Sequence, residues 1–221
     1  MIYTVGGIKG GSGKTTVATN LTVWLSSQGR DVLLVDTDDQ ETATDFTVWR
    51  SELTGGNTGY TAIQLSDSAV RTEVLKLEPK YDDIVIDTGG RDTASQRAAL
   101  TIAQVFLLPF IPRSFDIWTL EKVTALIEEI RPINPELKIL AFLNRSDPRG
   151  SDNLGASELL NESGAFTFLD APLGNRKAFA NAAAMGLGVT EVKPRDKKAI
   201  SELDALFHQC QSGVNGNGSR L

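Results

Sequence analysis

A glycine-rich segment near the start of the chain, GGIKGGSGKTT at residues 6–16, has the residue types and spacing that bind phosphate. Glycine permits a tight turn and a close approach of the backbone, so consecutive amides in this segment can converge on phosphate oxygens. Lys14 would reach the β- and γ-phosphates of a nucleoside triphosphate, and the Thr15 hydroxyl would be a ligand of Mg²⁺. Thr16 would donate to the α-phosphate. The nucleotide-binding residues predicted on these grounds are Gly10, Gly11, Ser12, Gly13, Lys14, Thr15 and Thr16.

The segment departs from the strict phosphate-loop pattern G-x-x-x-x-G-K-[ST], because Ile8 occupies its first position. The alternative interpretation is a glycine turn with a surface lysine. A predicted strand before the segment and a predicted helix after it favour nucleotide binding. A second lysine, Lys9, lies five positions before Lys14 and has no assigned role in an ordinary phosphate loop.

Two further apolar segments end in acidic residues. VLLVDTDDQ at residues 32–40 carries Asp36 and Asp38, and DDIVIDTGG at residues 82–90 carries Asp87. A carboxylate at such a strand end can hold Mg²⁺ through water, and the two glycines of the second segment can move as a switch that senses a γ-phosphate. An aspartate in this position also commonly caps the next helix. Two acidic strand ends beside one phosphate loop favour the metal site.

Short apolar runs alternate along the chain with longer amphipathic stretches, which is typical of a mostly parallel sheet flanked by helices. We therefore predict a doubly wound α/β fold, with ligands at the carboxyl ends of the strands. The expected strands are residues 2–5, 32–36, 62–65, 83–87, 105–110, 139–143 and 166–169. The expected helices are residues 14–27, 42–53, 70–77, 95–103, 120–130, 155–162, 178–185 and 196–211.

Composition narrows the class of protein. A chain of 221 residues is long enough for one α/β domain, expected at residues 1–211, and the polar residues 212–221 are expected to form a disordered tail. The formal net charge of −6 argues against a surface uniformly adapted to nucleic acid, although a local basic patch is compatible with it. The single cysteine, Cys210, allows no internal disulfide, which fits a cytoplasmic protein. No apolar run approaches the ~18 residues of a membrane span.

The run KGGSGKTT resembles the deviant Walker A motif of the ParA/MinD superfamily of P-loop NTPases, and the chain is most similar to small ParA-type partition ATPases. This resemblance implies a role for Lys9, because the signature lysine of the family crosses an ATP-sandwich dimer interface to contact the phosphates of the partner. An intersubunit cation would neutralise the charge of two facing triphosphates. The alternative is that Lys9 contacts phosphate in its own subunit.

The segment after the second strand resembles the D-x-D-P-Q segment of the same family, with Asp36, Asp38 and Gln40 at the matching positions and Asp39 in place of the proline. The resemblance implies that Asp38 orients the hydrolytic water and that Asp36 supports the metal site. The predicted catalytic residues are Lys9, Lys14 and Asp38. The predicted metal residues are Thr15, Asp36 and Asp87.

The sequence LNRSDPRG at residues 143–150 bears on the choice of base. Its Asn144 to Asp147 stretch approximates the N-K-x-D guanine motif, and DTGG also fits the D-x-x-G pattern of GTPases. The resemblance instead implies ATP, because an asparagine matching Asn144 contacts adenine in ParA-like proteins and the segment PLGNR lies near the base. The base contacts predicted from it are Asn144, Pro172 and Arg176. With ATP as the nucleotide, we interpret Arg145, Asp147 and Arg149 as a solvated, mutually paired loop. A GTP-dependent switch remains the alternative.

The segment EVKPRDKKAI gathers four cations within six positions: Lys193, Arg195, Lys197 and Lys198. The resemblance implies that they bind DNA without reading its sequence once ATP closes a homodimer, although a solvated helix start would look the same. Residues 109–118 resemble the proline-containing interface loop of the family, or form a rigid turn. The resemblance further implies a partner protein, ParB-like or another adaptor, that stimulates hydrolysis, nucleoid association in the ATP-bound state, and positioning of a plasmid, a chromosome region or a protein cargo without membrane binding. A metabolic phosphotransfer enzyme and an ATP-assembled polymer are the other classes left open.

Overall fold

A computed structural model of the chain describes residues 1–114, 117–147 and 150–215. Within these residues, seven strands form one parallel sheet in the order β3-β2-β4-β1-β5-β6-β7. The strands are β1 (Ile2–Val5), β2 (Val32–Asp36), β3 (Thr61–Gln64), β4 (Asp83–Asp87), β5 (Val105–Phe110), β6 (Lys138–Leu143) and β7 (Thr167–Phe168). The helices are α1 (Lys14–Ser27), α2 (Thr42–Leu53), α3 (Ser68–Leu77), α4 (Ala94–Leu100), α5 (Ile117–Ile130), α6 (Asp152–Glu162), α7 (Lys177–Ala183) and α8 (Lys197–Asn215), with 3-10 turns η1 (Glu78–Lys80) and η2 (Pro112–Ser114).

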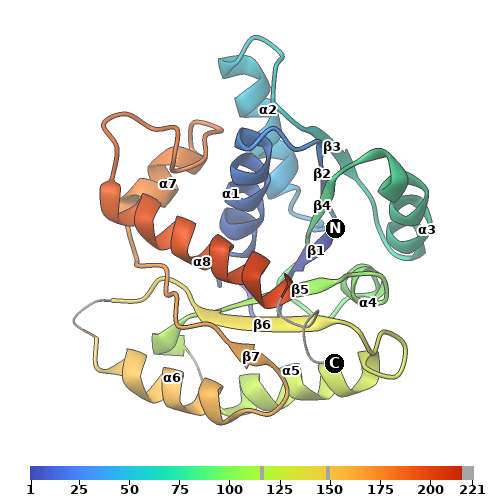
Figure 1. Ribbon diagram of the computed structural model, residues 1–221, viewed down its shortest axis with the longest axis vertical. Coiled ribbons are helices and arrows are strands. Elements are labelled where there is room, and N and C mark those ends of the chain that lie inside the picture. Colours follow the sequence, from blue (N-terminus) through green and yellow to red (C-terminus); the bar gives the residue numbers. More distant parts are fainter. Residues whose placement is uncertain (115–116, 148–149, 216–221) are drawn as a thin grey trace.

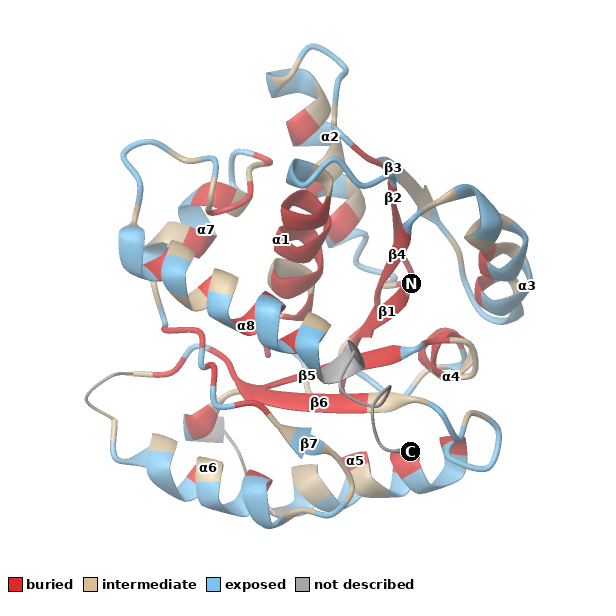
Figure 2. Ribbon diagram, in the orientation of Figure 1, coloured by how far each residue is buried: buried red, intermediate tan, exposed pale blue. Residues whose placement is uncertain are grey.

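Helices cover both faces of this sheet (Figure 1). Alternate residues of β1 show the division: Tyr3 and Val5 pack with α1, α2, α7 and α8, whereas Ile2 packs with α3 and α4. The remaining part of the second face, beneath β5 and β6, is covered by α5 and α6. Strands covered on both faces are apolar throughout, and β1, β2, β4 and β5 are buried along their whole length (Figure 2). The predicted doubly wound α/β fold is confirmed.

The position of β1 in the sheet determines where a ligand can bind. It lies between β4 and β5, and its last residue, Val5, is level with Asp87 of β4. Asp87 is in turn level with Asp36 of β2. The loops that follow these three strands therefore leave the sheet at one edge, where ligands bind in doubly wound folds.

The C-terminal helix differs from the expectation. Disorder was expected from residue 212, but α8 continues to Asn215, so the expectation is wrong for residues 212–215; residues 216–221 lie outside the described part. A buried row containing Leu203, Phe207 and Cys210 fixes the preceding turns against the core. Adding residues to a formed helix costs far less than nucleating one, so polar residues can extend it.

The other boundaries agree with the sequence to within a few residues. β7 has two residues where four were expected, and α4 ends at Leu100, followed by a turn in which Thr101 donates to the carbonyls of Arg97 and Ala98. None of the described helices combines the length and apolar character needed to span a bilayer.

Candidate nucleotide-binding site

The loop between β1 and α1 is held in the conformation that glycine allows. Gly11 and Gly13 have φ angles of 76° and 87°, in the left-handed region that other residues rarely adopt. Gly13 is the N-cap residue of α1, and no side chain caps that end of the helix. The first amides of α1 are therefore positioned to bind an anion, as the helix dipole also favours.

Lys14 is buried at this point, with its ammonium 3.2 Å from the carbonyl oxygen of Lys9, to which it donates. Burial lowers the pKa of Lys14, and the nearby carboxylates of Asp87 and Asp38 oppose this shift. The lysine is thus fixed in the loop beside two acidic groups.

Asp87 is fully buried, and neither of its carboxylate oxygens makes a hydrogen bond of standard geometry with a described residue. Burial raises its pKa to about 8, with the hydroxyl of Thr15 and then the ammonium of Lys14 opposing the shift. A buried carboxylate without a partner is costly, and a divalent cation beside Thr15 would compensate for it.

The donor set around Asp87 fits Mg²⁺ rather than a metal enclosed by protein ligands. In the described part of the chain, no three His, Cys, Asp or Glu residues come together as a metal site. Mg²⁺ typically takes one or two carboxylates and completes its octahedron with substrate phosphates and water. Thr15 and Asp87 are the residues that would hold it here.

Asp36 and Asp38 have different surroundings. Asp36 accepts bonds from the amide and hydroxyl of Thr44, at 2.8 and 2.9 Å, and from the amide of Asp38, at 3.1 Å. It therefore fixes the first turn of α2 and the loop that carries Asp38. Asp38 is half-buried, and a Cβ atom on Gly89 would lie 3.3 Å from its carboxylate. Asp38 thus faces the loop after β4.

These groups surround one open cleft of about 1160 Å³. Among the predicted residues, Gly10, Gly11, Gly13, Lys14, Thr15, Thr16 and Asp38 line it. Asp36 and Asp87 are buried and are not part of its lining. The loop after β4 touches the phosphate loop, because a Cβ atom on Gly90 would lie 2.7 Å from the Cα of Gly10.

The loop after β6 also contacts the phosphate loop. The buried side chain of Asn144 donates to the carbonyl of Ser12, at 2.7 Å, and a Cβ atom on Gly13 would lie 2.4 Å from the same amide nitrogen. Asn144 therefore lies against the P-loop, near the cleft, and its role as a base contact stays a prediction.

The neighbouring charges differ from our interpretation of a solvated, mutually paired loop of Arg145, Asp147 and Arg149. Arg145 lies at the cleft, and Asp147 pairs with Arg113 of η2 at 2.9 Å. Arg149 lies outside the described residues. Arg145 and Arg91 both line the cleft, and the sequence patterns had assigned neither to it.

Pro172 and Arg176, predicted near the base, are not among the described residues that line the cleft. A bridge between Ser146 and Gly174 places their segment beside the loop of Asn144. Pro172 lines a separate cavity of about 390 Å³, and Arg176 binds both carboxylate oxygens of Glu202, at 2.8 and 2.5 Å. Their contact with a base stays a prediction.

Lys9 lies on the other side of the phosphate loop. It is half-buried and, with Leu108, Phe110 and Thr119, lines a small pocket between the loop, β5 and the start of α5. The predicted interface segment, residues 109–118, borders this pocket, but residues 115–116 lie outside the described part. The crossing role of Lys9 stays a prediction.

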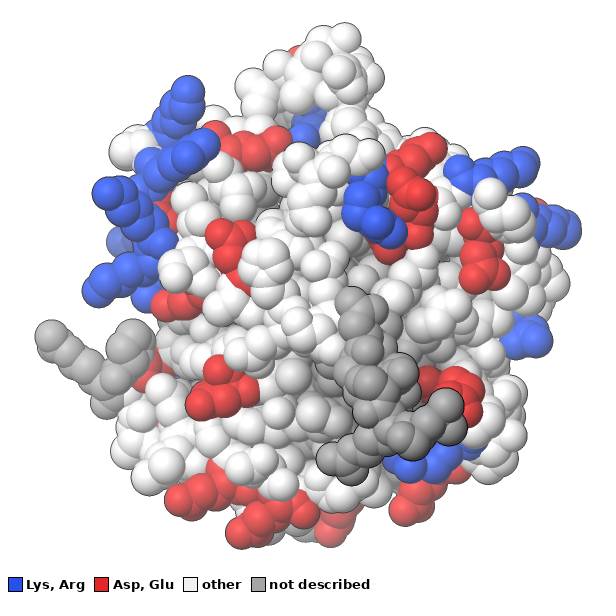
Figure 3. Space-filling model, viewed as in Figure 1, with Lys and Arg blue, Asp and Glu red and all other residues white. Residues whose placement is uncertain are grey.

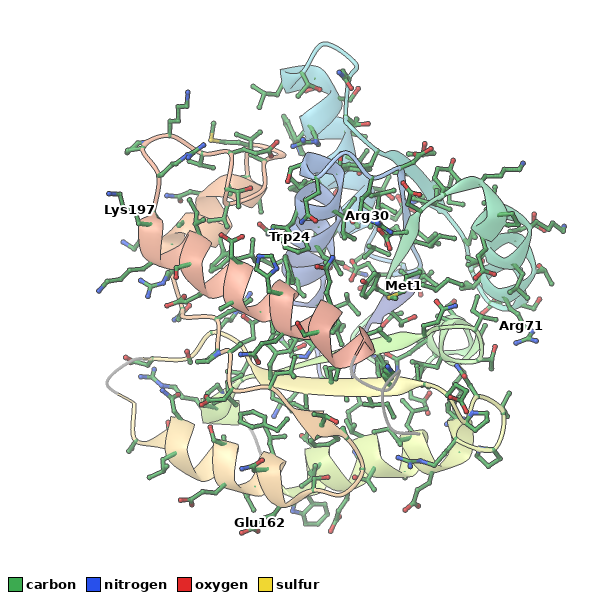
Figure 4. All side chains as sticks on the ribbon, in the orientation of Figure 1. Met1, Trp24, Arg30, Arg71, Glu162 and Lys197 are labelled. Carbon is green, nitrogen blue, oxygen red and sulfur yellow. The ribbon has the colours of Figure 1, made fainter. Side chains whose placement is uncertain are left out.

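The four predicted DNA-binding cations are all exposed. We call them the basic segment: Lys193, Arg195, Lys197 and Lys198. Positive side chains gather over the connection between α7 and α8 (Figure 3), and Lys197 projects from the start of α8 (Figure 4). None of the four forms an ion pair with a described residue. The surface offers four charges to an anionic partner.

An ion pair between a buried arginine and a partly exposed glutamate ties this connection to α2. Arg50 of α2 donates to both carboxylate oxygens of Glu191, at 2.7 and 2.8 Å, and to the carbonyl of Gly186, at 3.2 Å. A Cβ atom on Gly186 would lie 2.3 Å from the amide nitrogen of Arg50, so the two segments are in close contact. The basic segment thus begins two residues after a point fixed to α2, whose other end is fixed by Asp36.

A phosphate loop at a helix N-terminus, with acidic strand ends beside it in a parallel sheet, defines a P-loop nucleotide-binding domain. The chain matches the CobQ/CobB/MinD/ParA nucleotide-binding domain family over residues 3–189, and it belongs to that family.

Individual relatives indicate the branch of this family. The chain is 28% identical over 207 residues to the maintenance of carboxysome distribution protein A of Halothiobacillus neapolitanus, covering 93% of this chain and 94% of that protein. It is 30% identical over 192 residues to the protein of the same name from Gloeobacter kilaueensis, covering 86% and 84%. A solved ATP complex of McdA from Cyanothece has the same fold, with a TM-score of 0.76 at 16% identity over 100% of this chain and 98% of that one. The chain is thus a nucleotide-binding domain of the ParA/MinD family, with relatives named for carboxysome distribution.

Proposed function

We propose that the chain binds ATP with Mg²⁺, closes into a homodimer around two nucleotides, binds DNA without sequence preference in that state, and hydrolyses ATP to leave it. The observation that carries the proposal is the convergence of Lys14, Asp38 and the glycines of two loops on one cleft. Behind the cleft lies buried Asp87, whose carboxylate oxygens make no hydrogen bond of standard geometry with a described residue. The ATP complex of the Cyanothece protein supports ATP as the nucleotide.

The cleft residues divide the chemistry between them. The amides at the start of α1 and the Lys14 ammonium would hold the β- and γ-phosphates, and Thr15 with Asp87 would hold Mg²⁺, which supplies charge neutralisation at the phosphates. Asp38 would orient the attacking water, because its half-buried carboxylate lines the cleft beside Gly89 and Gly90, the glycines expected to act as a switch. Asp36 would set the position of Asp38 through the amide bond described above.

Dimerisation would depend on the triphosphate. Lys9 would contact the phosphates of the second subunit, so two subunits would bind each other only when charge is present to be neutralised. Dimerisation would also bring two copies of the basic segment together, and doubling the number of phosphate contacts steepens the dependence of DNA affinity on salt.

The related proteins suggest the kind of cargo. The two relatives described above are named for carboxysome distribution. A solved plasmid partition protein from Borrelia burgdorferi has the same fold, with a TM-score of 0.69 at 21% identity over 94% of this chain and 98% of that one. We infer that this chain positions a cargo in the cell through an adaptor protein that stimulates hydrolysis, with a large protein assembly as the favoured cargo and a plasmid as the other candidate.

The test is binding of the Asp38→Ala protein to random-sequence duplex DNA with ATP, ADP, GTP or no nucleotide, at several salt concentrations. Removing the water-orienting carboxylate should trap the ATP state, so we expect tight, salt-sensitive binding with ATP alone. Binding with GTP would reverse the choice of base at Asn144. No DNA binding under any condition would overturn the positioning function and favour a metabolic phosphotransfer enzyme.

A further inference from the structure

The first turn of α4 carries the sequence pattern of a helix-capping box, but only half of that box forms among the described contacts. Residues 93–96, T-A-S-Q, fit the capping-box pattern, in which the fourth side chain bonds back to the amide of the first residue. One half of the box is present, because the Thr93 hydroxyl accepts from the amide of Gln96 at 3.1 Å. The other half is absent from the described contacts, because the Gln96 side chain points into the core.

The side-chain oxygen of Gln96 joins two loops of the nucleotide site. It accepts from the amide of Gly7, at 3.0 Å, at the entry to the phosphate loop. It also lies 2.9 Å from the hydroxyl of Thr88, which directly follows Asp87 and precedes the switch glycines. The Thr88 hydroxyl is 3.1 Å from the carbonyl of Val5 as well, so β1, the loop after β4 and α4 meet at this point.

The packing around Gln96 leaves no room for substitution nearby. A Cβ atom on Gly6 would lie 2.8 Å from the Gln96 oxygen and 2.8 Å from the Thr88 hydroxyl. Gln96 is fully buried, and its amide nitrogen has no hydrogen-bond partner among the described residues. Burying an unpaired amide nitrogen is unfavourable, and a leucine would fill similar space without that cost. The contribution of this side chain is therefore its oxygen.

We propose that Gln96 is a positioning residue that couples the switch loop after β4 to the half of the phosphate loop that carries Lys9. A γ-phosphate that moves Gly89 and Gly90 displaces Thr88, and the shared oxygen of Gln96 transmits that displacement to Gly7, two residues before Lys9. Lys9 then reaches its dimer geometry only with a triphosphate bound. The inference rests on the proposed function, because it assumes that ATP drives dimerisation.

The groups predicted to bind the diphosphate do not contact the side-chain oxygen of Gln96, which bonds to Gly7 and Thr88. The amides of residues 11–14 and the hydroxyls of Thr15 and Thr16 lie in the second half of the loop and in α1, and Gln96 contacts the first half. Loss of the Gln96 oxygen should therefore spare ADP binding and weaken the response to the third phosphate.

The experiment compares Gln96→Leu with the wild-type protein and with Gln104→Leu. Gln104 is an exposed residue and serves as a control for the loss of a glutamine oxygen bonded to β1, because its side-chain oxygen accepts from the amide of Ile2 at the opposite end of that strand. Affinities for fluorescent ADP and for a non-hydrolysable ATP analogue are measured by titration, and dimerisation with the analogue by sedimentation velocity. Thr88→Val and Thr88→Ser provide a second pair, in which only serine keeps the hydroxyl.

We expect Gln96→Leu and Thr88→Val to keep the wild-type affinity for ADP and to lose about tenfold in analogue-driven dimerisation, a typical size for a coupling between sites. Gln104→Leu and Thr88→Ser should dimerise as the wild type does. Equal losses of ADP and analogue affinity in Gln96→Leu, or dimerisation unchanged in both Gln96→Leu and Thr88→Val, would overturn the inference. A wild-type protein that does not dimerise with the analogue would instead refute the proposed function.

Discussion

Replacing Arg50 by methionine is expected to lower the free energy of unfolding by about 2–3 kcal/mol, between the values for exposed and buried ion pairs. The Arg50 side chain is 8% exposed and its partner Glu191 32% exposed. The guanidinium also donates to the carbonyls of Thr58 and Gly186, which the substitution leaves without this donor. Methionine keeps most of the aliphatic stem, so the loss reports on the charged head group.

A comparison with Arg97 separates burial from the number of hydrogen bonds. Arg97 makes three bonds of 2.5–2.7 Å, two to Asp92 and one to Glu129, but these three side chains are 39%, 39% and 59% exposed. Exposed pairs contribute little, so Arg97→Met should cost about 0–1 kcal/mol. Urea unfolding of both variants, followed by tryptophan fluorescence, measures the difference. Equal losses for Arg50→Met and Arg97→Met would refute the reasoning that burial sets the magnitude.

The contribution of the Arg50–Glu191 pair to the free energy of unfolding should depend on pH, because the pair lowers the pKa of Glu191. Burial raises the pKa of Glu191, but the bonds from Arg50 and from the amide of Gly188 outweigh it, so the pKa lies below the ordinary value of 4.5. A lowered pKa means that folding favours the ionised carboxylate. The stability from this pair is therefore present above pH 4.5 and is lost as the pH falls through the folded-state pKa. The difference in the free energy of unfolding between the wild type and Arg50→Met, measured by urea unfolding at several pH values, should therefore become smaller as the pH falls through that pKa.

Three further variants test the nucleotide site and the basic segment. Lys9→Ala should abolish ATP-driven dimerisation while the monomer still binds ATP, and normal dimers by sedimentation would reject the crossing role. Neutralising the four cations of the basic segment should remove salt-sensitive DNA binding, measured by fluorescence anisotropy, and leave ATPase activity in place; retained binding would move the DNA surface elsewhere. Gly13→Ala should weaken nucleotide affinity by at least about tenfold in a titration, because its φ of 87° is strained for alanine and the added Cβ would lie 2.4 Å from the Asn144 amide. A Gly13→Ala protein with the nucleotide affinity of the wild type would show that the phosphate loop accommodates the Cβ atom without losing binding free energy.

Local patterns in the sequence were sufficient for the sheet and for the centre of the site. Strands covered on both faces are continuous apolar runs, so β1, β2, β4 and β5 have the bounds that the sequence predicted. Parallel strands end at one edge, and this geometry predicts from the sequence alone that Lys14, Asp38 and Asp87 are neighbours.

The residues that the sequence did not identify reach the site through tertiary packing. Gln96 fits a local capping pattern, which predicts a bond within its own helix, yet its oxygen is used by two loops distant in the chain. Arg145 lies in a motif that suggested a base contact or a solvated loop, but its φ of 53° and its place at the cleft depend on how the loop after β6 meets Gly13. Such contacts follow from the packing of elements, which periodicity does not encode.

The single cysteine of the chain has a practical consequence for measuring distances. Cys210 is buried on α8, and burial raises the pKa of its thiol to about 12. Thiolate is the reactive form, so maleimide and methanethiosulfonate reagents should leave this residue unmodified at neutral pH. A cysteine introduced at exposed Lys197 would then be the only site to take a spin label or a fluorophore. The native chain therefore serves as its own labelling background. In the proposed ATP-bound homodimer, the distance between the two probes would report how far apart the two copies of α8 lie.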